Sequence, residues 1–284
     1  MRILRVPHQM AAWSREVRRE GVCVGFVPTM GALHAGHRAL IRTARLSCDA
    51  VVVSIFVNPT QFGPREDLAR YPRPFTKDLR LCREEGVDVV YAPSVETMYP
   101  AGFQTQVSVP LVAMRWEGAI RPHHFAGVAT VVTKLLSTVQ PDRALFGQKD
   151  FQQSVVVRRL VKDLNLSCEI LVHPTVREAD GLALSSRNIY LSADERQRAP
   201  ILYRTLLSGA RLVREGRSTP GAIERVMRRL CGKERGVTIE YLAVCNPDTL
   251  DPLRRLTSRA VLLGAIRLGT VRLLDNLLVT PRRR

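Results

Sequence analysis

The chain has 284 residues, of which 45% are hydrophobic and 24% charged, with 18 glycines and 17 prolines. These values match an ordinary folded protein and exclude a disordered, collagen-like or coiled-coil chain. Since one domain usually takes about 100 to 200 residues, one large or two modest domains are expected. The 43 Lys and Arg against 26 Asp and Glu leave a net charge of +17. Such a charge favours anionic ligands, and nucleic acid, an acidic membrane surface and a polyphosphate all fit it.

The cysteines and the start of the chain indicate the compartment. The six cysteines form no Cys-x-x-Cys pair, and several lie in or beside apolar runs, so we expect buried thiols in a reducing environment. The first 19 residues lack the apolar segment of a signal peptide, and no run approaches the ~18 apolar residues of a membrane span. The sequence therefore predicts a cytoplasmic protein with no membrane partner.

Short apolar runs alternate with amphipathic stretches over the first two thirds of the chain, a pattern typical of a parallel sheet covered by helices. Strands are predicted at residues 22–27, 50–57, 87–91, 144–146 and 169–173. The first two should be central, and residues 50–57 form a nearly unbroken run rich in β-branched side chains. Helices are predicted between these strands at residues 36–46, 77–85, 128–139 and 151–164.

The pattern changes after about residue 175. A loop at residues 179–188 precedes helices near 193–215 and 221–231, and strands follow at 238–244, 260–265 and 270–275. We therefore predict an α/β protein with a Rossmann-like parallel-sheet domain over residues 1–175. A smaller α+β domain is predicted over residues 176–284.

Two histidines stand where the first predicted strand gives way to a helix. In the segment PTMGALHAGH, residues 28–37, His34 and His37 lie beside glycines that permit a tight turn. Unpaired backbone N–H groups at a helix N-terminus bind phosphate, and imidazoles add donors for charge that develops on an α-phosphate. A zinc half-site is the alternative for such a pair, but no third ligand is obvious nearby. The segment therefore predicts a phosphate site.

Six sequence blocks that include this segment carry a family resemblance. They are VPTMGALHAGH, VVVSIFVNPTQF, EDLARYPR, RPHHFAGV, FGQKDFQQ and DGLALSSRN, which occur in this order between residues 27 and 188. The His-x-Gly-His signature resembles that of the nucleotidyltransferase superfamily, and the full set resembles the pantothenate synthetase (pantoate:β-alanine ligase) family. The resemblance extends to the closing segment, residues 263–276.

That resemblance implies an ATP-dependent ligase. Pantoate would attack the α-phosphate of ATP to give pantoyl adenylate and pyrophosphate, and β-alanine would then displace AMP to give pantothenate. Magnesium is expected to bind through the ATP phosphates with no direct protein ligand, since Mg²⁺ on a nucleotide needs few protein oxygens. A homodimer is implied as well.

The resemblance also assigns site residues. The catalytic residues are His34, His37, Lys149, Ser185, Ser186 and Arg187. ATP binding is assigned to Met30, His37, Gly147, Lys149, Asp150, Val176, Leu184, Ser185, Ser186 and Arg187. Pantoate and β-alanine binding is assigned to Met30, Asn58, Gln61, Phe62, Arg121 and Gln153.

The chemistry of these residue types agrees with the assignment. Lys149 can neutralise phosphate as a mobile point charge, and Asp150 can accept hydrogen bonds from ribose hydroxyls. The two serine hydroxyls and the guanidinium of residues 185–187 make an anion clamp on a loop that can close over phosphates. Because the chemistry needs no protein nucleophile, positioning and charge stabilisation should supply most of the catalysis.

Two positions depart from the family pattern and keep other functions open. His123 stands where glycine is usual, and Lys77 stands where an acidic residue commonly precedes Asp78. A paralogue that uses a different amine is therefore the first alternative, with Asp78 and Glu117 as candidate acidic contacts. A nucleotidyltransferase that releases a nucleotide-linked product and a basic RNA-binding protein on a Rossmann scaffold are the others.

Overall fold

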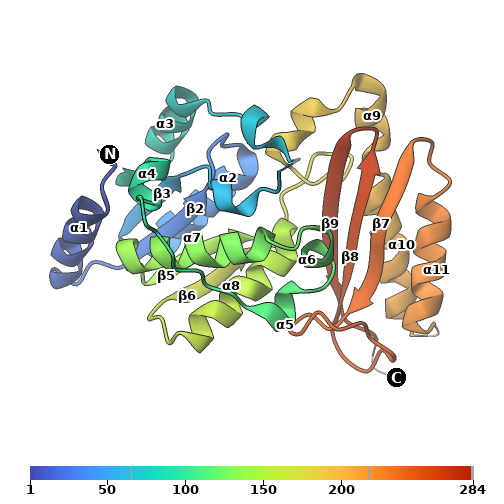
Figure 1. Ribbon diagram of the computed structural model, residues 1–284. Coiled ribbons are helices and arrows are strands. Elements are labelled where there is room, and N and C mark those ends of the chain that lie inside the picture. The colour runs from blue at the N-terminus through green and yellow to red at the C-terminus, as the bar shows by residue number, and fades with distance from the viewer. Residues whose placement is uncertain (65, 217, 283–284) are drawn as a thin grey trace. The chain divides into compact units, whose positions relative to one another are not determined.

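The computed structural model describes residues 1–64, 66–216 and 218–282, and Figure 1 shows its helices and strands. The chain divides into two compact units. The first consists of residues 1–147 and 152–174, and the second of residues 148–151 and 175–284. None of the described helices is long and apolar enough to cross a bilayer.

A six-stranded parallel sheet forms the centre of the first unit. Its strands are β1 (Arg2–Leu4), β2 (Val24–Thr29), β3 (Ala50–Ile55), β4 (Val89–Tyr91), β5 (Arg143–Gly147) and β6 (Glu169–His173). They lie in the order β1-β4-β3-β2-β5-β6, and every neighbouring pair is parallel. The predicted Rossmann-like sheet is confirmed, and β2 and β3 take the central positions expected from their sequences.

Helices cover both faces of this sheet (Figure 1). On one face lie α1 (Pro7–Arg19), α7 (His124–Val139) and α8 (Phe151–Asp163), and on the other lie α2 (Ala35–Ser47) and α3 (Phe75–Glu84). Because side chains alternate along a strand, Val52 packs in the first apolar cluster while Val51 and Val53 pack in the second. Strands buried on both faces therefore read as continuous apolar runs.

Short elements connect these strands and helices. They are η1 (Pro59–Gln61), η2 (Asp67–Arg70), α4 (Val95–Met98), α5 (Pro110–Ala113), α6 (Glu117–Ile120) and η3 (Gln148–Asp150).

The second unit is built on an antiparallel sheet with strands β7 (Val237–Cys245), β8 (Ala260–Leu268) and β9 (Val271–Val279). Helices α10 (Ile201–Glu215) and α11 (Pro220–Cys231) pack against it, and Leu206, Met227 and Leu262 are fully buried between them. The unit also contains η4 (Ser186–Tyr190) and α9 (Ala193–Arg198). The predicted α+β fold is confirmed.

Several elements differ from the prediction. The sequence patterns did not indicate β1 or α1, and β1 is a three-residue edge strand that pairs only with β4. The helix expected near residues 193–215 is two helices, α9 and α10, which are interrupted at Pro200. Proline has no N–H to donate to the preceding turn, so the helix ends and a second one begins.

The strand order fixes where a ligand can bind. The chain passes from β2 to β3 on one side and returns to β5 on the other side of β2. In open α/β sheets, ligands bind at the carboxyl ends of the strands where the order reverses in this way. A ligand-binding site is therefore expected in the segments after β2, β3 and β5.

Candidate functional site

The segment after β2 carries the two histidines, and each caps the helix that follows. The backbone N–H of Gly36 donates to Nδ1 of His34 at 3.1 Å, and the backbone N–H of His34 donates to Nδ1 of His37 at 3.3 Å. The ring centroids are 4.2 Å apart. The predicted pair is thus fixed at the N-terminus of α2 by reciprocal caps, the arrangement of a capping box.

These bonds also determine the tautomer of both rings. A backbone N–H can only donate, so each Nδ1 must accept with its lone pair. The proton of each neutral imidazole therefore lies on Nε2. Both histidines thus carry an Nε2–H donor of the kind that binds an anion.

A buried carboxylate holds the loop that precedes these histidines. Asp78 is 1% exposed, and its two oxygens accept the backbone N–H groups of Ala32 at 2.9 Å and Leu33 at 2.8 Å. Gly31 has φ of +80°, and a Cβ there would lie 3.0 Å from Oδ2 of Asp78, so glycine is needed for the turn. Burial raises the pKa of Asp78, while the two N–H donors oppose that shift. Asp78 thus holds the backbone of the loop in place, whereas the sequence suggested it only as an acidic contact for an amine.

The segment after β3 brings the predicted residues Asn58 and Gln61 together with Met30, and it also carries Phe62. Asn58 is 1% exposed and donates from Nδ2 to Oε1 of Gln61 at 3.2 Å, and Nε2 of Gln61 lies 3.0 Å from Sδ of Met30. The ring of Phe62 packs edge-on against Tyr71 at 5.9 Å between centroids. An amide thus lies beside apolar side chains, which suits a small molecule that has both polar groups and methyl groups.

Asn58 itself is held by the protein. Its Oδ1 accepts from the hydroxyl of Tyr99 at 2.8 Å, and its Nδ2 also donates to the carbonyl of Gly127 at 3.1 Å. A Cβ at Gly127 would lie 2.4 Å from the carbonyl oxygen of Thr60, so the glycine lets α7 approach η1 this closely. Asn58 is thus held in position to orient the side chain of Gln61.

Arg121 belongs to a network of four groups. Its guanidinium forms an ion pair with Glu66 and donates to the carbonyl of Gln61 at 3.2 Å. Nη1 lies 3.2 Å from Nε2 of His124, and Nδ1 of His124 lies 2.9 Å from that same carbonyl. Since the guanidinium can only donate, Nε2 of His124 accepts and its proton lies on Nδ1. The network fixes the backbone at Gln61 from two sides.

The electrostatics of the network follow from burial. Burial and the adjacent Arg121 charge lower the pKa of His124 from 6.5 to about 4. Burial opposes ionisation of Glu66, but the hydrogen bonds and charge of Arg121 hold the pKa of that carboxyl below its usual value. His124 is therefore neutral and Glu66 charged at neutral pH.

The two glutamines at the start of α8 differ in burial. Gln152 is 4% exposed and donates to the carbonyls of Val112 and Arg115 at 3.0 and 2.9 Å, so it holds the segment before α6. The predicted pantoate residue, Gln153, is half-buried on the next position of the helix. Glu117, considered as an acidic contact, is buried, and its backbone N–H donates to Oε1 of Gln152 at 3.0 Å.

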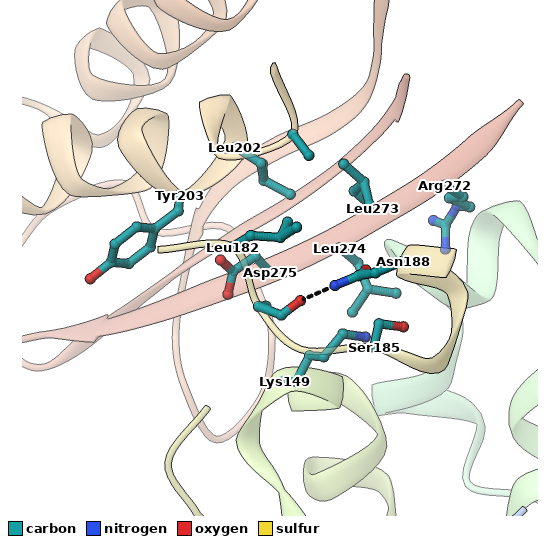
Figure 2. Close-up of a pocket in the computed structure, with 12 residues that line it drawn as sticks. Lys149, Leu182, Ser185, Asn188, Leu202, Tyr203, Arg272, Leu273, Leu274 and Asp275 are labelled. Atoms are coloured by element: carbon teal, nitrogen blue, oxygen red, sulfur yellow. Dashed lines mark hydrogen bonds between the residues drawn. The ribbon is translucent and has the colours of Figure 1, made fainter. Parts of the chain in front are cut away.

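A cavity lies within the second unit (Figure 2). Lys149 and Ser185 line it together with Asn188, Arg272 and Asp275. Asn188 donates from Nδ2 to the carbonyl of Ala183 at 3.1 Å, the dashed line in Figure 2. Its Oδ1 is buried, and no group within the described ranges is its partner. The cavity thus places a cation, a hydroxyl and an amide oxygen around one space.

The predicted phosphate loop is shaped as a hairpin turn. Val176 and Leu184 lie opposite each other, with the N–H of Leu184 donating to the carbonyl of Val176 at 3.0 Å. Ser185 is the N-cap of η4, and its Oγ accepts from the N–H of Arg187 at 3.3 Å. Ser186 and Arg187 follow in η4 and are half-buried.

The segment after β5 carries the remaining predicted residues. Gly147 ends β5, and a Cβ there would meet no atom within 4 Å. Nζ of Lys149 lies 3.6 Å from Oδ1 of Asp150, whose side chain is 49% exposed while that of Lys149 is 20% exposed. The lysine is therefore the more enclosed partner and faces the cavity, and the carboxylate remains accessible to a hydroxyl-bearing ligand.

No cluster of three or more His, Cys, Asp or Glu side chains that could hold a metal ion occurs among residues 1–64, 66–216 and 218–282. The donors present suit anions rather than a bare metal ion: imidazoles in the first unit, and a lysine, hydroxyls and a guanidinium in the second. A magnesium ion would fit such donors if it arrived on a phosphate ligand.

Comparisons with known proteins place the chain. A sequence profile described as "Pantoate-beta-alanine ligase" matches residues 2–278. The "Pantothenate synthetase" of Chloroflexus aurantiacus (strain ATCC 29366 / DSM 635 / J-10-fl) is 52% identical over 277 residues, which cover 97% of this chain and 98% of that protein.

Solved structures agree with the sequence matches. A crystal structure of the pantothenate synthetase from Thermus thermophilus is 48% identical, covers 99% of this chain and 100% of that one, and has a TM-score of 0.92. The pantoate-beta-alanine ligase from Francisella tularensis, complexed with beta-gamma ATP and beta-alanine, is 34% identical. It covers 98% of this chain and 97% of that one, with a TM-score of 0.79.

Replacing Asp78→Asn should loosen the loop before α2. The asparagine keeps one acceptor but turns an NH₂ group toward a backbone donor, which leaves a buried N–H without a partner. We expect the free energy of unfolding to fall by about 1–3 kcal/mol. Amide hydrogen exchange at Ala32 and Leu33 should become faster. Arg80→Gln, on the exposed side of the same helix, is the control, and equal exchange in both variants would contradict the role of Asp78.

The lowered pKa of His124 predicts loss of stability in acid. Between pH 6.5 and about 4 the unfolded chain binds a proton at His124 that the folded chain does not, so stability falls as the pH falls through this window. The loss should reach about 3 kcal/mol at most. Urea unfolding at pH 7, 6, 5 and 4 of the wild type and of His124→Gln measures it. The difference in free energy of unfolding between the wild type and His124→Gln should decrease as the pH falls. A difference that stays constant would show that His124 does not titrate in this way.

Proposed function

The chain belongs to the pantoate-beta-alanine ligase family, and we propose that it condenses pantoate with β-alanine in a reaction that consumes ATP. The products are pantothenate, AMP and pyrophosphate, with pantoyl adenylate as the intermediate. The observation that carries this proposal is the pair of Nε2–H imidazole donors at the N-terminus of α2, in a chain whose relatives match it over nearly their full length.

In the first half-reaction, a pantoate carboxylate oxygen attacks the α-phosphorus of ATP and the bond to pyrophosphate breaks. His34 and His37 donate from Nε2 to phosphate oxygens as negative charge develops on them. Lys149 adds a positive charge, and Ser185, Ser186 and Arg187 hold the phosphates. Preorganised donors of this kind stabilise the transition state more than the substrate, because they are already aimed at the developing charge.

Other residues of the proposal bind and orient the substrates. Gln61 and Gln153 bind the hydroxyl and carboxylate side of pantoate, and Met30 and Phe62 contact its methyl groups. Asn58 and Arg121 bind substrate beside Gln61, to which both donate hydrogen bonds. Gly147, Val176 and Leu184 adjoin the nucleotide, and Asp150 accepts from the ribose hydroxyls. Magnesium bound to the phosphates would neutralise part of the charge of ATP.

In the second half-reaction, the amine of β-alanine attacks the acyl carbon of the adenylate and AMP leaves. The two departures from the family pattern do not disturb this step in an evident way. His123 has φ of −94°, which any residue adopts, and Lys77 is exposed on α3. Of the amines considered, β-alanine is thus favoured over a different acceptor.

The proposal extends to organisation and location. Residues 1–175 would bind ATP and pantoate, with residues 176–284 as a lid, and the protein would act as a homodimer in the cytoplasm. All six cysteines, each within the described ranges, are free, as expected of a protein from a reducing compartment.

The products test the proposed reaction. Purified protein with ATP, magnesium and pantoate, with and without β-alanine, should give pantothenate and AMP but no ADP, as measured by mass spectrometry. Pantoyl adenylate that accumulates without pantothenate would indicate another amine. A released nucleotide-linked product that contains no amide would favour the nucleotidyltransferase.

The residue roles are tested by alanine variants. His34→Ala, His37→Ala and Lys149→Ala should each lower the rate of pyrophosphate release by a factor of about 10² or more, the scale for losing one preorganised donor. His8→Ala and Lys162→Ala remove the same types of side chain at exposed positions and should leave the rate unchanged. Near-normal rates in the first three variants would overturn these roles.

A further inference from the structure

A buried asparagine of the second unit forms hydrogen bonds with the segment that carries Lys149. Asn276 lies in β9 and is 1% exposed. Its Nδ2 donates to the carbonyls of Gln148 at 2.8 Å and Lys149 at 3.0 Å, and its Oδ1 accepts from Nε2 of Gln148 at 3.1 Å. The amide of Asn276 therefore donates to two consecutive carbonyls of one short stretch of backbone. Lys149 is 127 residues away from Asn276 in the sequence.

These hydrogen bonds join the segment to the second unit. Residues 148–150 lie between β5 and α8, yet they group with the second unit, as does Phe151 at the start of α8. The segment is the single-turn helix η3, which is too short to be stable by itself. With Asn276 bound to two consecutive carbonyls, the backbone on both sides of the Lys149 Cα is fixed to β9.

The adjacent residue of β9 holds the second segment of the same cavity. Asp275 is 5% exposed and forms a two-point ion pair with Arg177 at 2.6 and 2.8 Å, and Arg177 also donates to the carbonyl of Gly181 at 3.0 Å. The guanidinium carbon lies 4.0 Å from the ring centroid of Tyr203. The hairpin that leads to Ser185 is thus tied to β9 beside the segment that carries Lys149.

We propose that Asn276 is a positioning residue for Lys149. The inference rests on the proposed function, in which the ammonium of Lys149 neutralises a reacting phosphate. Lysine has a flexible four-carbon stem, so the place of its ammonium depends on where the Cα is fixed. A displacement of about 1 Å can lower a rate by about 10²-fold, and the amide of Asn276 prevents such a displacement.

The test is a double-mutant cycle between Asn276 and Lys149. The measured quantity is the single-turnover rate of pantoyl adenylate formation with ATP, magnesium and pantoate. Asn276→Leu has nearly the same shape and removes both donors, and it should lower the rate about 10-fold or more. Asn276→Ala also removes both donors and should lower the rate by a similar factor, and it continues the test if the leucine variant does not fold.

The expected result is strong coupling. If Asn276 acts through Lys149, its substitution should change the rate by less than about 3-fold in a Lys149→Ala background, since residues in one network are not additive. If the two effects multiply, Asn276 acts by another route and the inference is wrong. If Lys149→Ala alone has a normal rate, the proposed role of Lys149 fails first, and this outcome is distinct from failure of the inference.

A matched control separates positioning from stability. Asn246, in the turn after β7 of the same unit, accepts the N–H groups of Asp248 and Thr249 at 2.8 and 3.1 Å. Asn246→Ala removes two hydrogen bonds between a side chain and the backbone, as at Asn276, but none at the Lys149 segment. It should lower the melting temperature and leave the single-turnover rate unchanged. An equal loss of rate in Asn246→Ala and Asn276→Leu would overturn the inference.

Discussion

The hydrogen bond from a buried side chain to the backbone of a loop is the interaction on which this structure depends. Wherever the chain leaves a buried strand, its N–H and C=O groups lose their ladder partners, and leaving them unpaired is costly. Asp78 accepts the donors of the segment after β2, Asn58 fixes the segment after β3, and Asn276 binds the carbonyls of the segment after β5. Three loops that carry proposed site residues are therefore each held by a buried side chain.

Charge is used differently inside and outside. Ion pairs such as Arg211 with Glu215, at 82% and 44% side-chain exposure, lie at the surface and contribute little to stability. Arg177 with Asp275 and Arg121 with Glu66 are largely enclosed, and each arginine also binds a backbone carbonyl of the segment that it supports. Desolvation makes such pairs a poor source of stability, so their value lies in fixing geometry.

Local patterns predicted the parts of the fold that local physics determines. The apolar runs of β2 and β3 and the amphipathic face of α2 were evident in the sequence, as was the turn with Gly31, His34 and His37. The ordered blocks predicted a set of site residues, and their roles stay predictions. The three-residue strand β1 was not predicted, because a short strand at the edge of a sheet carries no long apolar run.

The supporting residues could not be predicted in the same way. Asp78 and Asn276 bind backbone groups 45 and 127 residues away, and His124 binds one 63 residues away. No spacing rule links such partners, since a backbone carbonyl is the same at every position of the chain. The sequence placed Asp78 and Asn276 in family-like segments, but only the fold shows which atoms they hold.

The hydrogen bonds of Asn276 to residues 148 and 149 join two segments that are synthesised far apart in time. The first unit has its full set of strands once the chain extends past β6, long before β9 exists. The turn that bears Lys149 gains its last hydrogen bonds only when β9 has been made and paired with β8. If Lys149 acts as proposed, a nascent chain would thus hold its two histidines in place before the lysine gains its anchor, and the reaction would have to await the last strand of the sheet.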